Sequence, residues 1–120
     1  MRVYMESIMK DMNDKEINEQ IPSGEKNLMG SDIMKDGMPL TLRKVCQNAL
    51  VGTYQDEQSL SGEEKVRRWS LAMKIKKSPD PVDLVSDEVV LVKKLIGKAY
   101  GPIICGPAWM LLEGGPSLDS

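Results

Sequence analysis

From residue 40 onward, apolar residues recur every three or four positions in four segments separated by helix-breaking residues. This spacing places apolar side chains on one face of an α-helix, so each segment predicts a helix. The breaks are Gly52, Ser78-Pro79 and Gly101-Pro102, because glycine favours helix ends and proline cannot continue a helix. The sequence therefore predicts a mainly α fold, a small bundle of about four helices at roughly 42–51, 62–77, 87–100 and 103–113.

Residues that can cap a helix stand before three of these segments. Thr41 precedes the first, and Ser61 precedes the second, where Glu64 completes a capping-box pattern. Ser86 is the N-cap candidate of the third helix, whose wide apolar arc predicts contact with two neighbours and a place at the centre of the core. The second helix is expected to bury an apolar stripe formed by Val66, Trp69, Ala72 and Met73, extended by Leu71 and Ile75.

The last predicted helix has no polar face. Pro107 lacks the N–H that would bond to Ile103, which favours a kink or a new helix start at Pro107. An element that is apolar on all sides must be covered, either by the helical core or by a partner. Tryptophan is enriched at binding hot spots, so the candidate partner-binding residues are Trp109, Met110 and Leu112.

Residues 1–39 carry few apolar positions and a net charge of −3, and they predict a short β-hairpin and loop segment. Its strands would be residues 3–10 and 16–21, joined by a turn at Met12–Lys15, and residues 22–27 have the composition of a loop. Residues 40–115 would then form the helical domain, and residues 116–120 a flexible tail.

Several classes of catalytic and metal site are disfavoured by composition. The chain has no histidine, which is the usual general base and imidazole ligand near neutral pH. Its two cysteines, Cys46 and Cys105, lie far apart, outside any metal-ligand motif, and are expected to be reduced and buried. No pair of carboxylates stands in an apolar context, and the calcium-loop spacing is missing. We therefore expect a protein that is not an enzyme, with no cofactor and no metal.

Charge and hydropathy bear on the cellular location. Glu6 and Lys10 interrupt the apolar core that a signal peptide would need, and no apolar run approaches the roughly 20 residues of a membrane span. The expectation is a cytoplasmic protein that does not contact membranes.

The second predicted helix is basic, with six basic and two acidic side chains. Arg67, Lys74 and Lys77 share its solvent-facing side and could contact nucleic-acid phosphates or an acidic partner. A pI near 5.2 argues against a dedicated nucleic-acid binder, as does the linker of about eight residues where a helix-turn-helix needs three or four. Nucleic acid is thus an unfavoured partner that the sequence does not exclude.

Three segments, LTLRKVCQNAL at 40–50, GEEKVRRW at 62–69 and LIGKAYGP at 95–102, resemble small uncharacterised phage and prophage accessory proteins in sequence and order. The resemblance covers most of residues 8–113 and brings no known active site with it. It implies a protein that works in the bacterial host cell by binding a host or phage protein, either inhibiting host machinery or assisting particle assembly. We therefore expect a protein-binding module that could self-associate through the C-terminal apolar element; the alternative is a nucleic-acid-binding phage regulator that uses the second helix.

Overall fold

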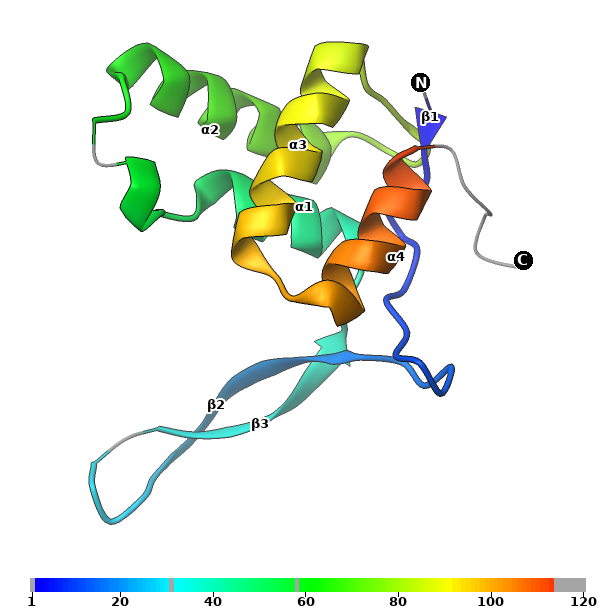
Figure 1. The fold of residues 1–120 in the computed structure, drawn as a ribbon. Coiled ribbons are helices and arrows are strands. Elements are labelled where there is room, and N and C mark those ends of the chain that lie inside the picture. The colour runs from blue at the N-terminus through cyan, green and yellow to red at the C-terminus, as the bar shows by residue number, and fades with distance from the viewer. Residues whose placement is uncertain (1, 31, 58, 114–120) are drawn as a thin grey trace.

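The computed structural model describes residues 2–30, 32–57 and 59–113, and within these it is a mainly α fold with an N-terminal β-hairpin (Figure 1). This confirms the predicted fold class. The predicted tail at residues 116–120 lies outside the described residues. The helices are α1 (Leu42–Val51), α2 (Gly62–Lys77), α3 (Ser86–Ala99) and α4 (Pro102–Leu112), with a short 3₁₀ turn, η1 (Gln55–Glu57), before α2. Each predicted helix boundary is therefore within one residue of the observed one.

The helix starts follow from local hydrogen bonds. Thr41 Oγ1 accepts from the Lys44 N–H at 3.3 Å, and Ser61 Oγ accepts from the Glu64 N–H at 3.1 Å, as predicted. The prediction of Ser86 as the third N-cap is wrong, because α3 begins at Ser86 itself. Its cap position is Val85, whose N–H donates to the Glu88 carboxylate at 2.9 Å.

Helices α1 and α3 lie at the centre of the helical body. α1 packs against α2 and α3, and α3 packs against α1 and α4, so the expected pair of neighbours for the third helix is observed (Figure 1). Both helices contribute a continuous buried face to the core, made of Leu42, Val45, Cys46, Ala49 and Leu50 from α1 and Val89, Leu91, Val92, Leu95 and Ile96 from α3.

The predicted apolar stripe of α2 is confirmed for Leu71, Ala72 and Ile75 and is wrong in the first half of the helix. Its buried residues are Arg68, Leu71, Ala72 and Ile75. Val66 and Trp69, predicted to be core residues, are 64% and 59% exposed. Arg68, which was not predicted to be buried, joins this face instead, and its guanidinium pairs with Glu57 of η1.

The hairpin lies later in the chain than predicted. Strands β2 (Asn18–Lys26) and β3 (Asp32–Pro39) pair antiparallel and project from the helical body (Figure 1). Residues 22–26, predicted as loop, are therefore part of a strand. The predicted turn at residues 12–15 does form, with Asp14 at a φ of 64° and a bridge between Lys10 and Glu16, but it joins no long strands.

The N-terminal segment completes the helical core. Val3, Met5 and Met9 are fully buried against it, and β1 (Arg2–Val3) pairs antiparallel with β4 (Val82–Asp83). The Asp80 carboxylate accepts the backbone N–H groups of Met5 and Glu6 at 2.7 and 3.0 Å, which ties this segment to the α2–α3 connection. In the described chain, the hairpin β2–β3 is therefore the part that stands apart from the helices (Figure 1).

The last helix is continuous. Pro102 occupies its first turn, where the missing N–H has no cost, and the helix runs through Pro107 to Leu112. The predicted new helix start at Pro107 is therefore wrong.

Candidate protein-binding surface

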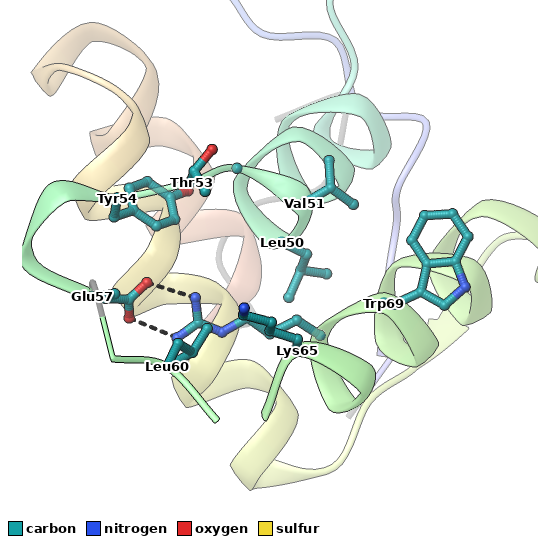
Figure 2. A pocket seen from close by; sticks show the side chains of 10 residues that line it. Leu50, Val51, Thr53, Tyr54, Glu57, Leu60, Lys65 and Trp69 are labelled. Carbon is teal, nitrogen blue, oxygen red and sulfur yellow. Dashed lines mark hydrogen bonds and ion pairs between the residues drawn. The ribbon is translucent and has the colours of Figure 1, made fainter. Parts of the chain in front are cut away.

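A pocket of about 690 Å³ opens between the C-terminal end of α1, the η1 segment and the first half of α2 (Figure 2). Its size falls in the range of ligand-binding pockets, roughly 300–1,000 Å³. It is lined by Leu50, Val51, Gly52, Thr53, Tyr54, Glu57, Leu60, Lys65, Arg68 and Trp69.

One side of the pocket is apolar. Trp69 stands on this side and Tyr54 and Glu57 on the opposite one, with Leu50 between them (Figure 2). Trp69 keeps more than half of its surface in solvent, and the neighbouring Val51 is also exposed. Large apolar side chains exposed together around a concavity are typical of an interaction site.

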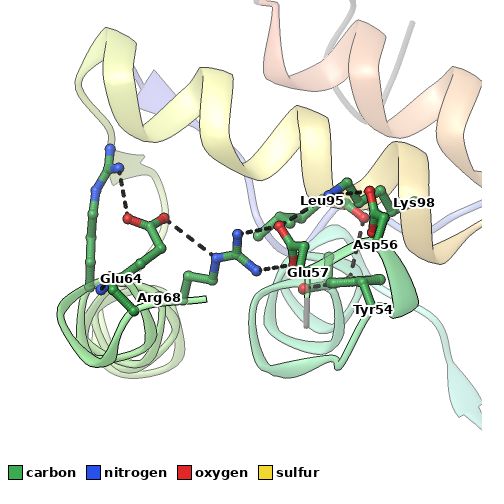
Figure 3. Close-up of polar contacts among 10 residues, drawn as sticks. Tyr54, Asp56, Glu57, Glu64, Arg68, Leu95 and Lys98 are labelled. Atoms are coloured by element: carbon green, nitrogen blue, oxygen red, sulfur yellow. Dashed lines mark hydrogen bonds and ion pairs between the residues drawn. The ribbon is translucent and has the colours of Figure 1, made fainter. Parts of the chain in front are cut away.

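The polar wall of the pocket contains an ion pair between Arg68 and Glu57. Arg68 Nη1 and Nη2 donate to the two carboxylate oxygens of Glu57, each at 2.7 Å (Figure 3). Lys98 of α3 donates to the same carboxylate at 3.0 Å and also pairs with Asp56 at 3.0 Å. These bonds, first of all the one from Arg68, lower the Glu57 pKa to about 2. Glu57 is therefore ionised near neutral pH and poorly suited to donate a proton.

The Arg68 guanidinium also faces Glu64, whose carboxylate lies 3.5 Å from Nε, on the side away from Glu57 (Figure 3). That nitrogen is buried and makes no hydrogen bond within the described residues. The Tyr54 hydroxyl donates to the Ala49 carbonyl at 2.6 Å, and burial raises its pKa. Arg68, Glu57 and Tyr54 thus form a fixed polar wall that joins α1, η1 and α2.

Lys65 is the charge in the pocket that remains available to a ligand. It is exposed, and within residues 2–30, 32–57 and 59–113 it makes no ion pair. Arg68 and Glu57 neutralise each other, so Lys65 leaves the pocket with a surplus positive charge. A ligand with an apolar group and a nearby carboxylate could place the apolar group against the Trp69 side of the pocket and pair the carboxylate with Lys65.

The predicted basic face of α2 is partly neutralised. Arg67 pairs with Glu64 at 3.5 Å, and Lys74 with Glu88 at 2.9 Å. Lys77 is exposed near the end of α2, and it makes no ion pair in the described part of the chain. The structure therefore does not bring Arg67, Lys74 and Lys77 together as three free cations.

The predicted C-terminal surface is divided between core and solvent. Leu112 is fully buried, so its assignment as a partner-binding residue is wrong; it packs in the core because α4 lies along α3. Met110 is exposed. Trp109 is fixed to α3, since its Nε1 donates to the Lys93 carbonyl at 2.9 Å and the Lys93 ammonium lies 4.6 Å from its ring centre.

The two cysteines differ in burial. Cys46 is buried as expected, whereas Cys105 is only partly buried. No group of three Cys, Asp or Glu side chains within the described ranges is placed to hold a metal ion.

Sequence reasoning missed the pocket because it assigned Trp69 to the core. The available signal was the spacing of Arg68 three, four and seven residues before Leu71, Ala72 and Ile75, together with the acidic pair Asp56-Glu57 in the preceding linker. Comparison with protein-family models, curated proteins and solved structures found no match to this chain. Among the described helices, none combines the length and the hydropathy that crossing a bilayer requires.

Proposed function

We propose that this chain is a non-enzymatic protein-binding accessory protein and that Trp69 is the centre of its contact surface. The observation that carries the proposal is the exposure of this tryptophan at the edge of the pocket between α1 and α2. Tryptophan offers a large contact area at a small cost in side-chain entropy, which explains its enrichment at binding hot spots.

The chemistry of the pocket defines the partner. Leu50, Val51, Leu60 and Trp69 favour an apolar side chain, and Lys65 favours a carboxylate beside it. The partner is therefore a protein segment with an apolar residue flanked by acidic residues. The Arg68–Glu57 pair would hold the pocket in one shape, which lowers the ordering cost of binding.

The biological setting we propose is that of a phage accessory protein in the cytoplasm of a bacterial host, as the sequence resemblance implies. Binding of a host or phage protein through the pocket would serve inhibition or particle assembly equally well. Nucleic-acid binding through α2 has less support, because Arg67 and Lys74 are each paired with a carboxylate. A charge that is already paired gains less from a phosphate.

Selection from a random peptide library displayed on particles tests this proposal. The retained peptides should share an apolar residue next to Asp or Glu, and Trp69→Ser should weaken their binding at least about tenfold. Ile103→Ser is the matched control, since Ile103 is an apolar residue on α4 that is 54% exposed. Binding that withstands Trp69→Ser, or a selection that enriches no such sequence, would contradict the proposal.

A further inference from the structure

We infer that the pocket receives the hairpin tip of a second copy of this chain. This inference rests on the proposed function, because it names the protein segment that the Trp69 pocket binds. Three observations support it: the projecting hairpin, its exposed apolar tip, and the opposite charges of the hairpin and α2.

The hairpin is shaped as an arm. Strands β2 and β3 pair with each other and carry the tip away from the helical body (Figure 1). A strand of nine residues extends about 30 Å at 3.4 Å per residue. An arm of this length can reach a neighbouring molecule, and Figure 1 shows its tip well separated from α2 of the same chain.

The tip presents two apolar side chains. Leu28 is fully exposed and Met29 is 88% exposed, although leucine and methionine are usually buried. The turn that carries them is ordered by local bonds: the Met29 N–H donates to Asn27 Oδ1 at 2.9 Å, and the Gly30 N–H donates to the Asn27 carbonyl at 3.0 Å. Gly30 has a φ of 81°, which glycine adopts without strain. The two side chains are thus held out in solvent on a defined turn.

Charge favours contact between the arm and α2. Strands β2 and β3 together contain four acidic and two basic residues. In the described part of the chain, α2 carries three cations that make no ion pair, Lys65, Lys76 and Lys77. At the pocket itself, the unpaired cation is Lys65. The apolar tip suits the apolar side of the pocket, and the net negative charge of the strands behind it is opposite in sign to that of α2.

The molar mass in solution, measured by sedimentation equilibrium from about 1 µM to about 1 mM, tests the inference. We expect the wild-type chain to self-associate. Leu28→Asp with Met29→Asp, a tip variant, and Trp69→Asp, a pocket variant, should each weaken association at least about tenfold. Lys65→Glu should weaken it as well. Met12→Asp is the control, because Met12 is a 93% exposed methionine on a different turn and should not affect the mass.

Mixing the two variants separates this contact from any other. The pocket variant supplies an intact tip and the tip variant an intact pocket, so the mixture should associate more strongly than either variant alone. Circular dichroism melting curves check that both variants are folded. Association that persists in both variants, or no association in the mixture, would overturn the inference.

The two proposals can fail separately. A wild-type chain that stays monomeric at the highest concentration, yet binds selected peptides through Trp69, would refute the second-copy inference and leave the proposed function standing. Peptide binding that ignores Trp69→Ser would refute the proposed function. If self-association were also unchanged by Trp69→Asp, both the proposed function and the second-copy inference would be refuted.

Discussion

Arg68 and Glu57 form a two-pronged ion pair in which both N···O distances are 2.7 Å. Their side chains are almost completely buried, so the pair connects η1 to α2 where water screens it little. Arg68 lies on the same face of α2 as the buried Leu71, Ala72 and Ile75, and Glu57 supplies the counterion of its charge there. Trp69, the next residue, lies at the pocket edge.

Removing one partner of this pair should destabilise the fold. Arg68→Met should lower the free energy of unfolding by about 3 kcal/mol, because it leaves the Glu57 carboxylate buried with Lys98 as its remaining cation. Glu57→Gln should also be destabilising, and the double variant should lose less than the two single losses together. Urea unfolding of the four proteins measures this coupling. Strictly additive losses would contradict a shared interaction.

Acid should remove the contribution of Glu57. Its pKa is lowered from the ordinary 4.5 to about 2 in the folded chain, chiefly by the bond from Arg68. A lowered pKa stabilises the fold fully above pH 4.5, and this stabilisation is lost as the pH falls towards 2. The difference in stability between wild type and Glu57→Gln should therefore shrink across this interval in urea titrations. A difference that stays constant over this range would show that the two states share one Glu57 pKa.

Leu112 and Met110 should respond differently to truncation. Leu112→Ala removes a fully buried side chain and should cost about 3 kcal/mol of unfolding free energy. Met110→Ala removes an exposed one and should change stability by less than about 0.5 kcal/mol. Thermal unfolding of both variants tests the division of α4 into core and surface. Equal losses would mean that this division is incorrect.

Trp109 should stabilise the packing of α4 against α3. Trp109→Phe keeps an aromatic ring but removes the N–H that bonds the Lys93 carbonyl, and it should cost about 1 kcal/mol. Trp109→Ala should cost more, because the ring contact with Lys93 is lost as well. Denaturant unfolding gives both values. A Phe variant as stable as wild type would show that the indole N–H bond contributes nothing net.

The two thiols should differ in reactivity. Burial raises the Cys46 pKa to about 12, so its thiolate is scarce near neutral pH and sterically covered. A chromogenic disulfide reagent should therefore modify the partly buried Cys105 in the native protein and Cys46 only after unfolding. Mass spectrometry of digested samples locates the label. Rapid native labelling of Cys46 would contradict its burial.

Local sequence signals account for much of this fold. Thr41 and Ser61 cap α1 and α2 as predicted, and the breaks at Gly52 and Ser78-Pro79 end them, because each acts through atoms a few residues away. The predicted hairpin strands lie too early in the chain, because the observed pairing, such as that of Asn18 with Pro39, joins residues far apart in sequence. Strand pairing depends on partners that local composition does not reveal.

The sequence by itself determined where helices begin and end, that α3 packs against two neighbours, and that Cys46 lies in the core. Only the tertiary structure decided that Arg68 rather than Trp69 is buried in the first half of α2, and hence where the candidate site lies. Hydrophobicity favours burial of Trp69 over Arg68, but Glu57 provides a partner that reverses this order. A buried charge is tolerated only where another element supplies its counterion, and that placement is a property of the folded chain.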